Sequence, residues 1–348
     1  MYQVEDLGTF GTFNDTSSVV PSDINDDGTV VGGLFYPNGV LAFSFTSAAG
    51  IVNLGGAPNA GANSIATGIN AAGQMAFMAD RSGGGGAYAP ARYSAPPPNV
   101  SQLPYLSTAG YTAVPPASYY TGGINGCGQI VGLAGASDTQ QLPFFNDGLT
   151  TVSLGSLGGT WGGAGAINDR GDIVGYSATA TTPPGNQWNL GHAFLYTNAA
   201  KMQDLNALAK NPSWELLMAS DINAYGEIVG YGTFTSSQGQ ALSAFLYKNG
   251  VVRNLGTFPN GGISWARGIN NRGDIVGEAY LNASGVGNYE ACIFVERFGA
   301  VNLNSLIDPS LGWNLRVAVA INDAGQITGY GTRSGAVGGR GFLLTPAW

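Results

Sequence analysis

The chain has 348 residues, 56 of them Gly, a formal net charge of −8 and only 10% charged residues. The charged fraction is low against the roughly 25% usual for soluble domains, yet a hydrophobic content of 44% is too high for a disordered chain. With 13 Lys and Arg and no basic stripe, we expect no nucleic-acid partner. No apolar run approaches the roughly 20 residues of a membrane-spanning helix, so we expect no membrane insertion.

A nine-residue motif recurs along the chain, with residues 167–175 (Ile-Asn-Asp-Arg-Gly-Asp-Ile-Val-Gly) as its clearest copy. Asn and Gly accept the dihedrals of a tight turn, and the Ile and Val that follow suit a buried strand. Each copy therefore predicts a strand, a turn and a second strand. The copies begin at Ile24, Ile69, Ile124, Ile167, Ile222, Ile269 and Ile321.

The first strand-like segment, residues 4–8, stands alone before the first motif. Each later repeat adds a third and a fourth strand after the motif, as residues 244–247 and 251–256 do around an Asn-Gly turn. The second repeat is the most divergent, with Met75-Ala76-Phe77-Met78 in place of the usual run. The only helix that we expect lies near residues 206–217. Repeats of this length with four strands predict β-propeller blades.

The two ends of the chain complement each other. The last repeat stops after its third strand, and residues 2–8 supply a fourth strand that has no partners before it. We therefore predict an all-β fold, one domain over residues 1–348, as a seven-bladed β-propeller whose N-terminal strand closes the last blade. Closure of this kind leaves only short, protected sheet edges.

Three short patterns support a family resemblance: His192-Ala193-Phe194, the Ile-Asn-x-x-Gly-x-Ile-Val-Gly motif, and Asp-Leu-Gly-Thr at residues 6–9. They resemble the bacterial HAF-type extracellular repeats over essentially the whole chain. The resemblance implies an exported or surface-exposed bacterial protein, and no signal peptide is recognisable in this chain. It implies no activity that can be carried onto residues, and six of the seven repeats lack the name-giving histidine.

Binding residues are expected on one face of the propeller. The motif turns and the turns between third and fourth strands are short and share what we call the motif face. The longer connections share the opposite face, the loop face, and variable loops on a rigid scaffold commonly carry binding residues. Aromatic rings beside polar groups suit sugars, although Trp also fills space between sheets. The candidates are Trp161, Trp188, Trp214, Trp265, Trp313, Tyr105, Tyr111, Asn186, His192 and Asp308.

These observations lead us to expect a non-catalytic recognition or adhesion module that binds a glycan or a cell-surface polymer. A polysaccharide-active hydrolase or lyase on the same face is an alternative, since a glycosidase needs two carboxylates about 5–10 Å apart. A structural subunit that self-associates is another alternative. The carboxylates that suit the enzyme are Asp80, Glu215, Glu278, Glu290 and Asp308.

No cofactor or metal site is expected. His192 is the only histidine, and the spacing of Cys127 and Cys292 suits neither a metal site nor a disulfide, so we expect two free thiols. The acidic residues of the motif lack a calcium-loop pattern and are explained by turn chemistry. Asp23 and Asp221 precede the motif Ile on the innermost strand, where we expect them to line a central channel.

Overall fold

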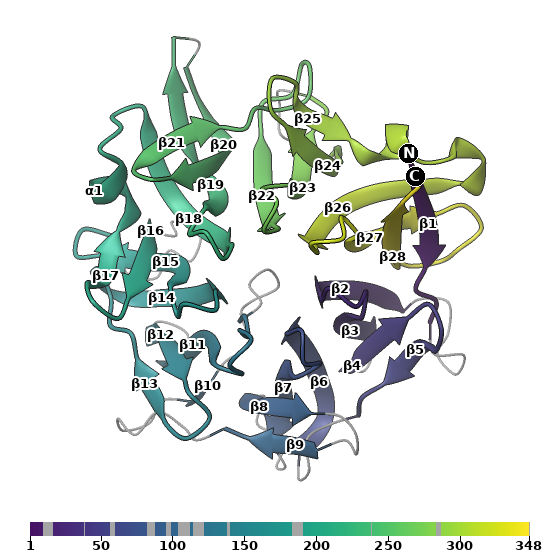
Figure 1. Ribbon diagram of the computed structural model, residues 1–348, viewed down its shortest axis with the longest axis horizontal. Coiled ribbons are helices and arrows are strands. Elements are labelled where there is room, and N and C mark those ends of the chain that lie inside the picture. Colours follow the sequence, from purple (N-terminus) through teal and green to yellow (C-terminus); the bar gives the residue numbers. More distant parts are fainter. Residues whose placement is uncertain are drawn as a thin grey trace.

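The computed structural model describes residues 1–9, 17–37, 39–55, 60–81, 88–94, 99–103, 112–113, 122–137, 140–182, 191–237, 239–282 and 287–347. Within these ranges the chain forms five four-stranded sheets and one eight-stranded sheet. The sheets stand around a common axis, with the innermost strand of each pointing toward the centre (Figure 1). The fold is therefore all-β and of the β-propeller kind.

In the four-stranded sheets formed by consecutive strands, the strands follow one another from the axis outward (Figure 1). The first three sheets along the chain contain β2 (Ser18–Ile24), β3 (Val30–Tyr36), β4 (Gly39–Thr46) and β5 (Gly50–Asn53); β6 (Ala60–Ile69), β7 (Met75–Arg81), β8 (Tyr88–Ser94) and β9 (Asn99–Gln102); and, in the eight-stranded sheet, β10 (Thr112–Ala113), β11 (Ile130–Ser137), β12 (Gln140–Asn146), β13 (Thr151–Ser153), β14 (Gly158–Ile167), β15 (Ile173–Thr179), β16 (His192–Thr197) and β17 (Lys201–Asp204).

The remaining sheets repeat this order. They contain β18 (Trp214–Ile222), β19 (Ile228–Ser236), β20 (Gly239–Lys248) and β21 (Val251–Asn254); β22 (Ser264–Ile269), β23 (Ile275–Tyr280), β24 (Tyr289–Val295) and β25 (Gly299–Asn302); and β26 (Trp313–Ile321), β27 (Ile327–Arg333), β28 (Arg340–Pro346) and β1 (Tyr2–Asp6). The helical segments of the described ranges are α1 (Leu205–Ala209), η1 (Leu303–Leu306) and η2 (Pro309–Leu311).

The ends of the chain meet in one sheet. Strand β1 pairs antiparallel with β28, with Tyr2 opposite Pro346 and Asp6 opposite Phe342. This is the pairing that the incomplete repeats at the two ends predict, and it places the termini side by side (Figure 1). The first residues are thereby tied into the sheet formed by the last.

A glycine and a phenylalanine face each other in several sheets. Gly329 on β27 lies opposite Phe342 on β28, and a Cβ at Gly329 would lie 2.6 Å from the Phe342 ring and 2.0 Å from the carbonyl oxygen of Val317. The motif therefore ends in Gly because a fully buried phenylalanine ring packs on the second strand. In the divergent repeat the sizes are exchanged, since Phe77 on β7 lies opposite Ala91 on β8. The two strands of this repeat thus supply one large and one small side chain to the core, as in the other repeats, but on the opposite strands.

Two further expectations can be compared with the structure. Both cysteines are free, as predicted; Cys127 is exposed and Cys292 is buried. The short helix α1 lies at the start of the segment where a helix is expected. In the described ranges, none of the helices has both the length and the apolar character needed to cross a membrane.

Candidate functional site

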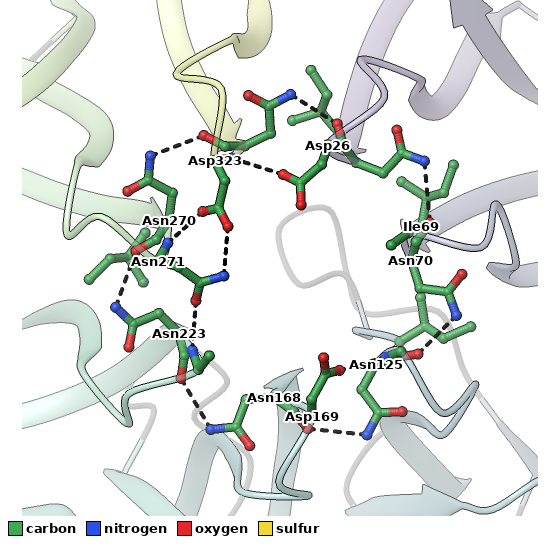
Figure 2. A pocket seen from close by; sticks show the side chains of 18 of the residues that line it. Asp26, Ile69, Asn70, Asn125, Asn168, Asp169, Asn223, Asn270, Asn271 and Asp323 are labelled. Carbon is green, nitrogen blue, oxygen red and sulfur yellow. Dashed lines mark hydrogen bonds between the residues drawn. The ribbon is translucent and has the colours of Figure 1, made fainter.

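The motif asparagines form a closed ring around the axis on the motif face (Figure 2). The side-chain Nδ2 of each Asn donates to the backbone carbonyl of the next, at 2.9–3.3 Å, until the last returns to the first. The order is Asn25, Asn70, Asn125, Asn168, Asn223, Asn270 and Asn322. Each repeat is thus tied to the next by the same kind of contact.

Each ring asparagine also builds its own turn. The Oδ1 atom of Asn168 accepts from the backbone N–H groups of Arg170 and Asp172, both at 3.0 Å, and its carbonyl accepts from Gly171. Asn168 is only 5% exposed, so these bonds satisfy groups that water cannot reach. The motif needs Asn because one short amide donates across the sheets and accepts within the turn at the same time.

A polar hollow of about 240 Å³ opens at this ring. Its rim includes Asp26, Asp323 and Asn271, and a side-chain oxygen of each accepts a backbone N–H from the preceding sheet, as when Asp26 takes the N–H of Asp323 at 2.9 Å. These polar groups are already engaged in holding the sheets together. We therefore interpret the hollow as the opening of a structural ring of asparagines rather than as a ligand site (Figure 2).

Two carboxylates line the inner strands just before the ring. Asp23 accepts the N–H of Ile24 at 2.8 Å and that of Ile69 on the next sheet at 2.9 Å, and Asp221 makes the same pair of bonds with Ile222 and Ile269. Burial raises the pKa of Asp23 to about 7, outweighing these hydrogen bonds, and the charge of Asp221 adds to the rise. Burial likewise raises the pKa of Asp221 to about 6.

The raised pKa of Asp23 makes stability depend on pH. Its neutral form is favoured in the folded protein, so its contribution is most favourable below its ordinary value of 3.8 and declines as pH rises through about 7. We expect Asp23→Asn to flatten this decline, which amounts to at most about 4 kcal/mol for a shift of this size. Urea denaturation from pH 4 to pH 8 measures it, and parallel curves for the two proteins would contradict the assignment.

On the loop face, the histidine of the sequence forms a partly buried, hydrogen-bonded pair with a carboxylate. His192 begins β16 and Asp204 ends β17, and the His192 Nδ1 lies 2.7 Å from the Asp204 Oδ2, with both side chains rather less than a third exposed. Because a carboxylate at neutral pH only accepts, Nδ1 carries the proton and Nε2 is the unprotonated nitrogen of the neutral ring. The ring is therefore set up as a base.

The charges around this pair tune both groups. The hydrogen bond to Asp204 raises the pKa of His192, partial burial opposes it, and the charges of Asp204 and Glu215 add to the rise. Burial pushes the pKa of Asp204 upward, but the hydrogen bonds from His192 and from the Asn206 N–H outweigh it, so the pKa lies below its ordinary value. The carboxylate stays ionised and the imidazole titrates above its usual range.

The same scaffold recurs two sheets later with different end groups. Asp204 caps α1 through the Asn206 N–H at 2.9 Å, and the Asn206 side chain bonds both backbone groups of Leu216. Asn302, Asn304 and Leu315 repeat these bonds around η1, where Glu290 replaces His192 and accepts from Asn302. In both places these hydrogen bonds fix the connection from the fourth strand to the next inner strand. The imidazole is found only at β16.

The tryptophans lie elsewhere than expected. Trp161, Trp214, Trp265 and Trp313 lie in the inner strands β14, β18, β22 and β26 instead of the connecting loops. Trp214 is only 8% exposed and packs against Phe234 and Phe245, so it belongs to the core. The other three are half-buried, Trp161 beside Tyr176, Trp265 beside Tyr231 and Tyr280, and Trp313 beside Phe342.

Several predicted residues fall outside what the structure describes. These are Trp188, Tyr105, Tyr111 and Asn186, together with the side chain of Asp80. Asp308 is exposed and caps η2, where its hydrogen bonds from Ser310 lower its pKa. Glu278 is 1% exposed and paired with Arg267, whereas Glu215 is exposed near His192.

Sequence reasoning missed Asp204 as the partner of His192. The signal was present in the Asp-Leu-Asn at residues 204–206, which returns as Asn-Leu-Asn at residues 302–304. Both segments end a fourth strand, and their sequence alone predicts only a strand and a turn. Pairing Phe194 with Asp204 across β16 and β17 brings the histidine two residues earlier into reach.

Comparison with known proteins adds the fold of an enzyme. No family model and no curated protein matches the chain. A solved oligogalacturonate lyase from Vibrio parahaemolyticus is similar at a TM-score of 0.56 and 8% identity, over 99% of this chain and 97% of that one. An oligogalacturonate lyase solved in complex with manganese is similar at a TM-score of 0.56 and 10% identity, over 99% and 93%. At these identities the likeness shows the fold alone.

This comparison corrects the main functional expectation. We expected a non-catalytic recognition or adhesion module, whereas the two similar structures, matched over nearly their whole lengths, are oligogalacturonate lyases, which are enzymes. Aromatic rings and polar loops could not separate these classes, because binding modules and enzymes contact sugars in the same way. The alternative of a hydrolase or lyase agrees better with the comparison.

The described residues offer no site for a metal ion like the manganese of the second structure. In the described part of this chain, no three His, Cys, Asp or Glu side chains gather as a metal site would require. The one histidine of the sequence already bonds Asp204 through Nδ1. The described donor set does not fit such an ion, and we derive no step through a metal.

Proposed function

We propose that the chain is a polysaccharide-active lyase that cleaves a uronate-containing saccharide on its loop face, with His192 as the general base. The observation that carries the proposal is the 2.7 Å contact of the His192 Nδ1 with Asp204, which leaves Nε2 unprotonated in the neutral ring. The fold shared with oligogalacturonate lyases supports the choice of substrate class. Asp204 acts as the positioning residue for the imidazole.

The chemistry balances with these groups. Nε2 of His192 takes the proton from the ring carbon next to the uronate carboxyl, and the electrons of that C–H bond form the carbon–carbon double bond. The bond from the neighbouring carbon to the glycosidic oxygen breaks, and that oxygen leaves with its electron pair. The imidazolium then returns its proton to the leaving oxygen, and Asp204 stabilises the transient positive charge.

Elimination suits these residues better than hydrolysis. A glycosidase needs two carboxylates, one of them a proton donor. Glu278 is buried in an ion pair with Arg267, and Glu290 is held by Asn302 and Asn304, so neither is placed as a free acid. One oriented histidine meets the needs of an elimination, since the same group both removes and returns the proton.

We also propose the finer architecture and setting that the repeats predict. Seven blades are supported by the closed ring of asparagines and by the eight-stranded sheet, in which one parallel bridge between Gln141 and Trp161 joins two four-stranded halves. Closure of the last blade by the N-terminal strand is supported by the pairing of β1 with β28. An extracellular setting is supported by the resemblance to exported repeats.

Incubation with a panel of polysaccharides tests the activity. Polygalacturonate, alginate and other uronate polymers are compared with neutral glucans and galactans, and ultraviolet absorbance follows the double bond of the product. We expect absorbance to rise with at least one uronate polymer and with no neutral one. New reducing ends without any rise in absorbance would indicate a hydrolase and overturn the proposal.

A further inference from the structure

A row of aromatic rings crosses neighbouring sheets toward the loop face. Tyr231 on β19 lies 5.7 Å from Trp265 on β22, Trp265 lies 5.8 Å from Tyr280 on β23, and Tyr280 lies 5.4 Å from Tyr289 on β24, all measured between ring centroids. All four side chains are half-buried. The rings are thus held firmly by the sheets and still present part of their surface.

An arginine ends this row. The guanidinium of Arg316, on β26, lies 4.6 Å from the centroid of the Tyr289 ring, and its Nη2 donates to the carbonyl of Gly287 at 3.1 Å. Arg267 and Arg333 also lie over aromatic rings, but each is paired with a carboxylate, Glu278 and Asp6 respectively. Among the residues that the structure describes, Arg316 has no carboxylate within ion-pair distance.

This contrast is informative in an acidic protein. The chain carries 21 Asp and Glu against 13 Lys and Arg, and in the described residues the other arginines that lie over aromatic rings are each neutralised by a carboxylate, whereas Arg316 is not. The tyrosine beneath and the carbonyl of Gly287 orient the guanidinium while leaving other N–H groups for a ligand. A planar fork of this kind matches a carboxylate, and ring faces match the C–H face of a sugar.

We propose that Tyr231, Trp265, Tyr280, Tyr289 and Arg316, which we call the aromatic strip, form a subsite for a carboxylate-bearing sugar residue. The choice of an acidic saccharide rests on the proposed lyase function. His192 lies on β16, two sheets earlier in the chain than β24. The aromatic strip therefore holds sugar residues beyond the cleaved bond and selects polymers that carry a uronate there.

Calorimetric titration tests the subsite. Proteins carrying His192→Gln, so that the ligand is not consumed, are titrated with an oligogalacturonate and with its fully methyl-esterified form, which has the same rings without the charge. We expect Arg316→Gln to weaken binding of the acidic form about tenfold or more and to leave the esterified form unchanged. Arg170→Gln, at an exposed arginine of the motif face, is the matched control and should change neither.

The outcomes separate this inference from the proposed function. Equal affinities with and without Arg316→Gln, or no measurable binding of the acidic form by the parent protein, would overturn the subsite. If the polymer panel gives an unsaturated product but Arg316→Gln has no effect on binding, the function stands and the subsite falls. If binding depends on Arg316 but no product forms, the subsite stands and the lyase falls. Thermal unfolding checks that Arg316→Gln is folded. Arg316→Lys keeps the positive charge but lacks the planar guanidinium, and so separates the two contributions to binding.

Discussion

Replacing one ring asparagine, Asn168→Ala, is expected to lower the free energy of unfolding by about 3 kcal/mol. The substitution removes the bond to the carbonyl of Asn223 and leaves the N–H groups of Arg170 and Asp172 without an acceptor. Asn168 is only 5% exposed, so water cannot easily replace these bonds. A buried polar group left without a partner costs about 1–3 kcal/mol. Urea denaturation measures the loss at a pH where both proteins are soluble.

Asn198→Ala is the matched control for the ring. Asn198 lies in the exposed turn between β16 and β17, so the same substitution there should change stability by less than about 0.5 kcal/mol. Asn168→Asp keeps the acceptor of the turn but cannot donate to Asn223, and it adds a charge beside Asp172. We expect it to be destabilised as well. Equal stability of Asn168→Ala and Asn198→Ala would show that the ring does not hold the sheets together.

The largest effect on activity is expected from His192→Gln. If Nε2 of His192 removes the substrate proton, its loss should lower kcat by a factor of about 10²–10⁴, with a much smaller change in KM. Thermal unfolding must accompany the kinetics, because the imidazole also bonds Asp204. If His192→Gln unfolds near the melting temperature of the unsubstituted protein and keeps its kcat, His192 is not the base.

Asp204→Asn tests how the base is tuned. Because the hydrogen bond to Asp204 and the carboxylate charge raise the pKa of His192, their loss should move the rising limb of kcat/KM to lower pH. The rate above that limb should also fall, since the tautomer is no longer held. Glu296→Gln, at an exposed carboxylate paired with Arg253, is the control. An unchanged limb in Asp204→Asn would contradict the assigned pair.

The repeating parts of the fold were predictable because each has a local physical cause. The Ile-Asn-x-x-Gly turn, the buried run after it and the terminal strand at residues 2–8 follow from turn chemistry and alternation within single strands. The pairing of Gly329 with Phe342 depends on the neighbouring strand, and so does the exchange at Phe77 and Ala91. In sequence the second repeat only looks divergent. In the structure its large residue, Phe77, and its small residue, Ala91, have exchanged strands.

The candidate site was less predictable because it depends on pairing between elements. His192 was recognised, but Asp204 comes into reach only through the register of β16 with β17. Trp214 has the same appearance in sequence as Trp265, yet the first packs under α1 in the core and the second stands in the aromatic strip. Arg316 carries no sequence signal, since its proposed role depends on its place over the Tyr289 ring with no carboxylate partner among the described residues, which only the packing of β24 and β26 determines.

Isotope labelling of the cleavage products tests the central claim most directly. The uronate polymer that gives a product in the panel is cleaved in water enriched in heavy oxygen, and mass spectrometry reads the new chain ends. Elimination by His192 predicts that one fragment is lighter than its hydrolysis counterpart by one water, and that the new reducing end gains no more heavy oxygen than the same fragment does by exchange without enzyme. Heavy oxygen at the new reducing end beyond that gained by the same fragment incubated without enzyme, with no fragment lighter by one water, would mean that water attacked the bond, and the assignment of a lyase would be wrong.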